Sequence, residues 1–443
     1  MATGTWLDDL TPDRETRNRQ RAALGNVIVL WAGRLLMAAV FFVVFVGFHP
    51  LSRDLTGGAS GNIQRQLSFI SLALIAMPII LMRWGQALRT LAGAWHLWLV
   101  LAALGATALW SNFPDVTVRR LILMMIIAVV GLGLAVSLNR PRDYMIAIGC
   151  GFGFILAFDM VLAVAMPSFA YDALGLAGLH PQKNVAGMAG LMFVSIFVSL
   201  LFGLRHPAAF WTVAFMLVLS LVFLFLTNSK TSLGIALISA VIAAPAFALA
   251  HRGLVFASML GLGLVVAVGI VVFATGTFHL SGADWAEMTT GDPTFTGRDQ
   301  IWAASVQEIA KAPLLGHGFG AVWSMLPLFH PLGQYVGFWT DSYDTLLAIN
   351  QSHNGYLDLL MHGGLFLFVI VMIFILKIIK TMIQTFRSTD RWAIAGNVFV
   401  GTFLLNTLLN NMMESTIFFP DGLLGTFLIL VALAQVSWSK HRI

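Results

Sequence analysis

Charged residues and cysteines are scarce in this chain of 443 residues. Only 10% of its residues are charged, whereas 58% are apolar, and the mean hydropathy is +0.86. Apolar stretches near the roughly 20-residue length of a membrane span recur along the chain, which is typical of a polytopic membrane protein. The single cysteine, Cys150, lies inside an apolar stretch. We therefore expect no disulfide and no cysteine-based metal site in the polar parts of the chain.

The apolar segments lack the alternation of polar and apolar residues that strands of a membrane barrel need. Such strands alternate over about ten residues, whereas the segment 121–138 is apolar all round. The fold class is therefore all-α. We predict twelve spans, at approximately 27–48, 67–82, 91–110, 121–138, 144–166, 185–204, 209–226, 231–250, 253–275, 364–382, 392–409 and 422–438.

The net charge of +5 indicates membrane orientation rather than nucleic-acid binding, because the basic residues are scattered between the spans. If the N-terminus is cytoplasmic, most of the 25 Lys and Arg lie on the cytoplasmic side. The positive-inside rule then predicts that both termini are cytoplasmic. The expected parts are a basic arm (1–26), nine spans (27–275), one large extracytoplasmic loop (276–363), and three spans with a short tail (364–443).

Two dense polar clusters lie in the long loop. The first, Thr296–Trp302, begins a predicted amphipathic helix over 299–312 and places Arg298 in its first turn. A helix N-terminus with an adjacent arginine makes an anion site suited to phosphate. The alternative is that Arg298 merely pairs with Asp299 or with a loop carbonyl.

His353 lies in the second cluster, Ser352–Asp358, at the start of another predicted helix. A histidine at the membrane surface can act as a general base, and a nearby carboxylate such as Asp358 could orient it. The alternative is a hydrogen-bonded interfacial histidine without a catalytic role. Further cations are expected on the same side of the membrane and together indicate a polyanionic ligand at the outer leaflet; they are Lys183, Lys230, Arg119 and Arg120.

Four blocks of sequence resemble the signature motifs of the O-antigen ligase and Wzy-type polysaccharide polymerase superfamily. Three of them are Thr227–Ser232, Gly297–Trp302 with Pro313–Gly318, and Ser352–Asp358. The fourth, His180–Asn184, resembles the exopolysaccharide-polymerase (ExoQ-like) branch. These blocks cover roughly residues 180–365, whereas the N-terminal third matches only as hydrophobic spans.

The resemblance implies a GT-C-like inverting glycosyltransferase that uses no metal or other cofactor. Its donor would be an undecaprenyl-diphosphate-linked glycan at the periplasmic face of the bacterial inner membrane. By motif position, Lys230 and Arg298 would hold the diphosphate and His353 would activate the acceptor hydroxyl. Arginine is usual where Lys230 stands, and a lysine supplies charge without a bidentate fork. Substrate binding is expected from residues in or near these blocks: His180, Lys183, Asn184, Arg119, Arg120, Trp302, Asn354 and Tyr356.

The residue types agree with this chemistry independently of the resemblance. A diphosphate is a good leaving group that needs cations more than a protonating acid, and a histidine can take the proton of a sugar hydroxyl. Six loop aromatic residues are candidates for sugar stacking or for interfacial anchoring, namely Trp285, Trp302, Trp323, Tyr335, Trp339 and Tyr343.

Three functions remain open at this point. The His180–Asn184 block favours a polymerase that joins lipid-linked repeat units. The alternative is a ligase that moves glycan onto lipid A-core or another acceptor. A flippase or small-solute transporter is disfavoured, because only Asp159 places a charge in mid-membrane, where its partner is not evident from sequence. Expected partners are the donor, a glycan or lipid A-core acceptor, membrane lipids, and a chain-length regulator with export machinery; no nucleic acid is expected.

Overall fold

The computed structural model describes residues 14–46, 63–253, 298–324, 349–418 and 423–440, together with the single positions 255, 263, 284 and 287. Within these residues, eight helices are long and apolar enough to cross a membrane, and one bent pair of helices would make a ninth. The chain is therefore an all-α polytopic membrane protein. The count of twelve spans stays a prediction, since most of 253–275 lies outside the described residues.

The helices are separated by short connections, and a two-stranded hairpin is the only sheet in the described residues. In chain order the elements are α1 (Arg14–Phe41), η2 (Phe42–Val46), α2 (Ile63–Met82), α3 (Trp84–Gly93), α4 (Trp95–Ala106), η3 (Thr107–Leu109), α5 (Pro114–Ser137), α6 (Pro141–Ala165), α7 (Pro167–Ala170), β1 (Tyr171–Asp172), β2 (Gly175–Leu176), α8 (Lys183–Gly203), α9 (Pro207–Leu226), α10 (Lys230–Ile238), η4 (Ser239–Ala243), α11 (Ala244–Ala248), η5 (Ala250–Arg252), α14 (Arg298–Lys311), η6 (Val322–Ser324), α16 (Gly355–Thr385), α17 (Arg391–Asn410) and α18 (Leu423–Lys440).

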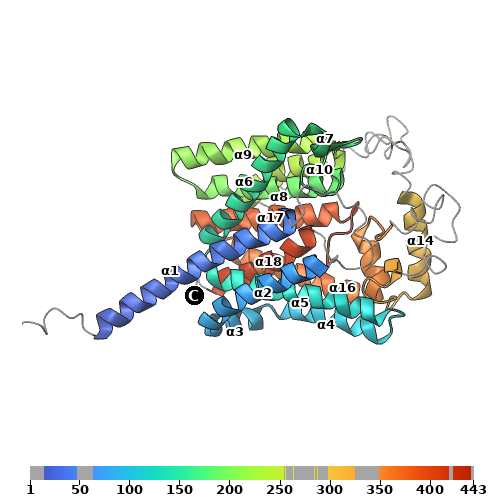
Figure 1. The fold of residues 1–443 in the computed structure, drawn as a ribbon, viewed down its shortest axis with the longest axis horizontal. Helices are drawn as coiled ribbons and strands as arrows, with labels where there is room; N and C mark the ends of the chain where they lie inside the picture. The colour runs from blue at the N-terminus through green and yellow to red at the C-terminus, as the bar shows by residue number, and fades with distance from the viewer. Residues whose placement is uncertain are drawn as a thin grey trace, which may run out of the picture.

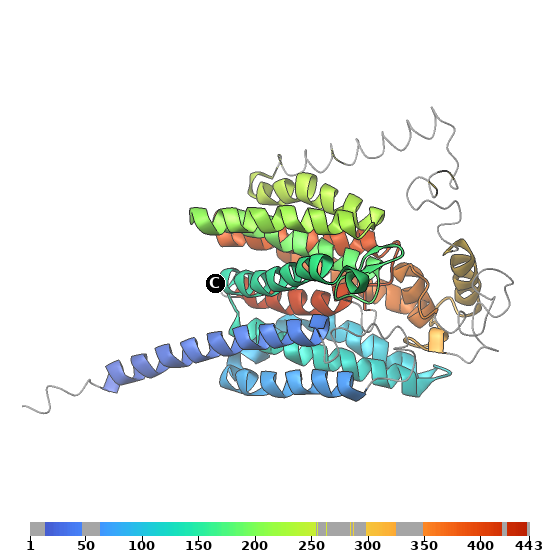
Figure 2. The same cartoon turned by 45° about the horizontal axis from the view of Figure 1, so that its top comes forward.

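The long helices lie roughly side by side and form a bundle with two distinct ends (Figure 1, Figure 2). Helix α17 packs against α8, and α18 packs against α5, so these four helices make up much of the core. Helix α8 is 83% buried over its most apolar window, whereas α9 is only 17% buried. Because apolar surface costs nothing in lipid, we assign α9 to the lipid-facing rim and α8 to the centre.

Two breaks in the helices shape the ends of the bundle. The chain bends by 107° where α2 gives way to the short helix α3. Helix α16 begins at Gly355, nine residues before the predicted span, and loses helical geometry at Gly363 and Gly364. Gly364 has a φ of 60°, a conformation that glycine adopts without strain.

The motif Pro313–Gly318 runs beside the break in α16 and forms hydrogen bonds with its free backbone groups. The N–H groups of His317 and Gly318 donate to the carbonyls of Met361 and His362, at 2.8 and 2.9 Å. On the other side of the break, two N–H groups of α16 donate to the carbonyls of Pro313 and Leu314. A Cβ at Gly316 would collide with the backbone of the break. This part of the signature therefore stabilises an interrupted helix.

Candidate active site

A buried pair fixes the segment that leads into α8. Asp159 of α6 is fully buried, and its carboxylate lies 3.1 Å from Nε2 of His180. The other carboxylate oxygen accepts the N–H of Leu179 at 2.8 Å. Gly178 has a φ of +59°, and a Cβ there would overlap Asp159. The partner of Asp159 is therefore His180, whose ring is held inside the protein and positions the start of α8.

Asn184, in the first turn of α8, points to the loop that follows α17. Its side-chain amide donates to Oε1 of Glu414 at 3.0 Å. Lys183, the residue before it, is half-buried at the start of the helix. The His180–Asn184 block thus contributes one direct contact to the site, through Asn184.

His353 occupies a turn whose backbone is fixed by its neighbours. Its φ is +53°, a left-handed conformation that is uncommon for a residue with a Cβ. Asn354 follows as the N-cap of α16 and accepts the N–H groups of Tyr356 and Leu357 at 3.1 and 3.3 Å. The hydroxyl of Ser352 donates to the carbonyl of Asn354 at 2.6 Å. These bonds give His353 a defined direction, and Asn354 has a capping role.

The imidazole of His353 contacts Glu414. Nδ1 lies 2.9 Å from Oε2 of the carboxylate, and the His353 side chain is 20% exposed. An ionised carboxylate only accepts hydrogen bonds, so Nδ1 carries the hydrogen. In the neutral ring Nε2 then has a free lone pair and can accept a proton. The arrangement matches the base and its orienting acid in an acid–base–nucleophile triad.

Arg298 reaches the same carboxylate from the other side. It is the first residue of α14, and one guanidinium nitrogen donates to Oε1 of Glu414 at 2.6 Å. The side chains of Arg298 and Glu414 are 11% and 8% exposed. Burial by itself would raise the pKa of the Glu414 carboxyl, but the adjacent His353 and Arg298 outweigh burial and hold the pKa below its ordinary value. Glu414 is therefore an ionised bridge between the two residues.

The loop that carries Glu414 is fixed by Asn411. The Asn411 side-chain oxygen accepts the N–H groups of Thr416 and Ile417, each at 3.0 Å. The N–H of Gly355 donates to the Asn411 carbonyl at 2.8 Å, and a Cβ at Gly355 would overlap the Asn411 side chain. The glycine of the Ser352–Asp358 motif therefore lets α16 start against the end of α17.

Glu414 was not identified by the sequence analysis, which named Asp358 as the carboxylate that orients His353. That assignment is wrong, because Asp358 is 3% exposed and turned away into a separate network. Its carboxylate accepts the indole N–H of Trp323 at 2.8 Å, the N–H of Ser352 and the hydroxyl of Ser415. Trp323, a candidate for sugar stacking, is 6% exposed and is occupied by this bond. The aromatic residues Trp285, Tyr335, Trp339 and Tyr343 lie outside the described residues.

Lys230 begins α10 and is exposed. Within the described part of the chain, no ion pair or hydrogen bond of its amino group is observed. The first turn of α10 packs against α8 at Gly187, where the hydroxyls of Ser229 and Ser232 leave no room for a Cβ. Gly187 is one turn along α8 from Asn184. Glu414, His353, Arg298 and Asn184 form the Glu414 cluster. Lys230 lies near this cluster and makes no observed contact with it.

The N-terminal ends of four helices gather around this cluster. They belong to α8, α10, α14 and α16, which begin at Lys183, Lys230, Arg298 and Gly355. Each helix start offers free N–H groups and the positive end of a helix dipole. Lys183 and Lys230 have no acidic partner among the residues that the structure describes, so the site favours a multiply charged anion such as a diphosphate.

Four other expected binding residues do not join the cluster. Arg119 pairs with Asp115 at 3.6 Å on the surface of α5. Arg120 packs against Gly320, beneath the loop that follows α14. Tyr356 donates its hydroxyl to the carbonyl of Leu408 at 2.9 Å, which joins α16 to α17. Trp302 lies half-buried on α14.

The other histidines near the loop are less suited to act as a base. His317 has its ring 2.8 Å from the carbonyl of Glu308, and His362 is 2% exposed. His279 and His330 lie outside the described residues. Among the residues that the structure describes, no group of three His, Cys, Asp or Glu side chains is placed to hold a metal ion.

Part of the chain is similar to one known family. Residues 215–372 match the family model of the O-antigen ligase. This part of the chain is similar to the O-antigen ligase family. No curated protein matches the chain. The match supports a role in polysaccharide biosynthesis of the O-antigen ligase type. The match runs from α9 into α16 and includes Lys230, Arg298 and His353, whereas Asn184 and Glu414 lie outside it.

Proposed function

We propose that this protein is an inverting glycosyltransferase that polymerises undecaprenyl-diphosphate-linked oligosaccharide repeat units at the periplasmic face of the bacterial inner membrane. The observation that carries the proposal is the contact of Glu414 with both His353 and Arg298. It joins an oriented base to a phosphate-binding cation within one cluster. Such a pair is what transfer of sugar from a diphosphate to a hydroxyl requires.

The proposed step begins when Nε2 of His353 removes the proton of the acceptor hydroxyl. The hydroxyl oxygen forms a bond to the anomeric carbon as the bond from that carbon to the diphosphate oxygen breaks. Attack from the face opposite the diphosphate inverts the anomeric centre. Glu414 stabilises the imidazolium that forms, and the proton remains on His353 until solvent removes it.

Negative charge accumulates on the departing diphosphate, and Arg298 and Lys230 lie where they would stabilise it. Arg298 uses one nitrogen for Glu414 and keeps further N–H donors for phosphate oxygens. Lys230 and Lys183 add charge from the starts of α10 and α8. This cationic environment supports a reaction without a divalent metal. The metal independence is part of the proposal.

The orientation of the site is supported by the other end of the bundle. Arg83, Arg89, Arg140 and Arg142 line a pocket near the start of α17, whereas Glu414 follows the end of α17. Arginines gather on the cytoplasmic side of bacterial membrane proteins. The end with Glu414 is then periplasmic. Asp159, the single mid-membrane charge expected from the sequence, is paired with buried His180, which gives no support to a transporter.

A ligase is the second candidate, because the matching family model carries that description. The two functions differ in the acceptor. Purified protein is incubated with lipid-linked repeat units, with and without lipid A-core, and the products are separated on a gel. A ladder from donor alone supports the polymerase, whereas product that requires lipid A-core supports the ligase. If no product forms in either case, both the polymerase and the ligase functions are contradicted. If EDTA abolishes the product and an added divalent metal restores it, the metal-independent mechanism is contradicted.

A further inference from the structure

A pocket opens at the end of the bundle opposite Glu414. Its volume is about 940 Å³, and its walls come from α1, the bend between α2 and α3, the turn between α5 and α6, and parts of α17 and α18. Trp392 and Asp390 contribute at the start of α17, whose 20 residues separate this pocket from Asn410. A helix of that length spans about 30 Å, so the pocket and the candidate active site lie about a membrane thickness apart.

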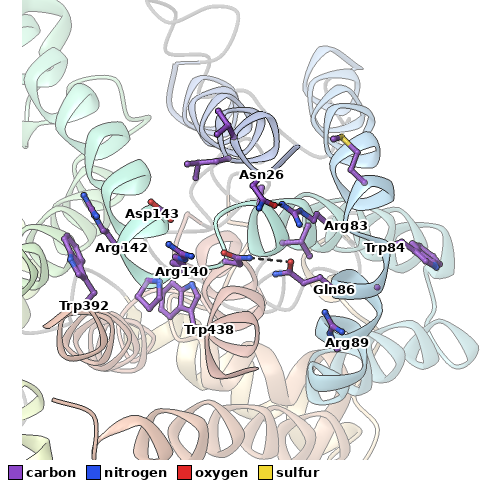
Figure 3. Close-up of a pocket in the computed structure, with 18 of the residues that line it drawn as sticks. Asn26, Arg83, Trp84, Gln86, Arg89, Arg140, Arg142, Asp143, Trp392 and Trp438 are labelled. Atoms are coloured by element: carbon purple, nitrogen blue, oxygen red, sulfur yellow. Dashed lines mark hydrogen bonds between the residues drawn. The ribbon is translucent and has the colours of Figure 1, made fainter. Parts of the chain in front are cut away.

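Positive charge dominates the pocket. Its lining contains four arginines and two aspartates. Figure 3 shows Arg140 and Arg142 on one side of the pocket and Arg83 and Arg89 on the other. One of the aspartates, Asp390, is engaged as the N-cap of α17, where its carboxylate accepts the N–H of Ala393 at 2.8 Å. The pocket therefore keeps an excess of positive charge for a ligand.

Two of the arginines have neutral partners. Arg83 donates to the side-chain oxygen of Asn26, and Arg142 stacks over the ring of Trp392 at 6.0 Å. The side chain of Arg140 is exposed, and it makes no ion pair with any side chain that the structure describes. The neutral partners of Arg83 and Arg142 hold these two guanidinium groups in place without cancelling their charge.

The remaining walls are aromatic and apolar. Trp84, Trp392 and Trp438 line the pocket together with Leu30 and Met82. Trp84 is 53% exposed. Tryptophans of this kind sit at the level of lipid headgroups, where one part of the ring meets hydrocarbon and the other meets water. A ligand that fits both walls carries an anionic group and an apolar chain.

We propose that this pocket binds the phosphate-bearing headgroup of an anionic phospholipid. Scattered arginines suffice for orientation in the membrane, whereas here four of them face one cavity with room for more than a phosphate ion. Basic pockets between helices on the cytoplasmic side are a known form of headgroup recognition. The proposal concerns a site far from His353 and does not depend on the proposed reaction.

The test measures binding of dioctanoyl phosphatidic acid to the full chain in detergent by microscale thermophoresis. Dioctanoyl phosphatidylcholine and inorganic phosphate are measured in parallel. The double variant Arg83→Gln with Arg140→Gln removes one guanidinium from each side of the pocket. Arg205→Gln is the matched control, because Arg205 is exposed in the connection between α8 and α9 and does not line the pocket.

We expect phosphatidic acid to bind the wild type and Arg205→Gln equally, and the double variant at least about tenfold more weakly, as expected for lost charge-assisted hydrogen bonds. Phosphatidylcholine should bind weakly to all three. If inorganic phosphate binds as tightly as phosphatidic acid, the site takes free phosphate, and the lipid assignment is overturned. If Arg205→Gln weakens phosphatidic acid binding as much as the double variant does, the lipid is attracted by diffuse surface charge and not by the pocket.

The double variant is examined for folding by its melting temperature. If it fails to fold, Arg140→Gln alone serves, since that side chain is exposed and its removal leaves no described partner unpaired. Arg298→Ala should bind phosphatidic acid as the wild type does. A loss of binding in Arg298→Ala would place the lipid at the candidate active site and contradict the proposal.

Discussion

Nδ1 of His353 lies 2.9 Å from the carboxylate of Glu414, although 61 residues separate them in the chain. The contact leaves Nε2 as the free nitrogen of the ring, and Arg298 binds the other oxygen of the same carboxylate. Glu414 also binds Arg298 and Asn184 through its other oxygen.

Replacing Glu414 by glutamine should slow transfer by about two orders of magnitude or more, because an amide can present the wrong hydrogen-bonding group to Nδ1 and no longer stabilises an imidazolium. The measurement is turnover of lipid-linked oligosaccharide by purified protein. Glu308→Gln is the control, since Glu308 pairs with Lys311 on α14 away from the cluster. Wild-type turnover by Glu414→Gln would remove this residue from the mechanism.

Replacing His353 by alanine should slow transfer by about two to four orders of magnitude, the usual contribution of a positioned base. Binding of the lipid-diphosphate donor should persist, because it depends on the cations. Donor binding and turnover are measured on the same preparation, with His317→Ala as the control. Near-normal turnover by His353→Ala contradicts the assignment of the base.

Arg298→Ala and Lys230→Ala should both lose transfer activity while the proteins remain expressed. Arg298→Lys should lose more activity than Lys230→Arg, because only Arg298 uses its fork to bind Glu414 and phosphate together. The four variants are compared by turnover at saturating donor. Full activity in Lys230→Ala would show that this exposed lysine lies outside the site.

Gly355→Ala should destabilise the protein by about 1 to 3 kcal/mol, since a Cβ there overlaps Asn411 and forces the two helix ends apart. Gly234→Ala is a matched control on α10, where nothing lies within 4 Å of the added methyl group. That substitution should stabilise by about 0.5 to 1 kcal/mol. Melting temperatures of the two variants, measured in the same detergent, should move in opposite directions; a shared shift would contradict the packing at Gly355.

The pH dependence of stability should also reveal Glu414. Its pKa is held below the ordinary value of 4.5, so the carboxylate contributes stability above that pH and loses it as the pH falls through the folded-state pKa. The melting temperature of the wild type should exceed that of Glu414→Gln near pH 7, and the difference should shrink below about pH 4.5. A difference that is constant down to pH 3 would contradict an ionised Glu414.

The parts of the site that local sequence could predict are those set by neighbouring residues. Arg298 begins a helix and His353 precedes one, as capping and periodicity indicated. Glu414 could not be assigned in this way, because its partners come from α8, α14 and the start of α16. The one available signal was a carboxylate in the polar run 410–416 between two spans. Asp358 is near His353 in the chain, yet its carboxylate binds Trp323, Ser352 and Ser415 instead.

The same limit applies to Asp159. A carboxylate inside an apolar helix requires a partner, and this much was evident from the sequence. Its partner, His180, belongs to a block that resembled a substrate-binding motif. The hairpin β1–β2 and the turn at Gly178 bring the two together, and short turns of this kind leave little trace in hydrophobic patterns.

The interruption of α16 at Gly363 and Gly364 limits the length of straight helix that leads to His353. A straight helix of 31 residues would be about 46 Å long, whereas the hydrocarbon core is about 30 Å thick. Without the break, His353 would be carried well above the lipid surface. The polyprenyl chain of the proposed donor would keep the diphosphate at headgroup height, and the two glycines would then keep the imidazole within its reach.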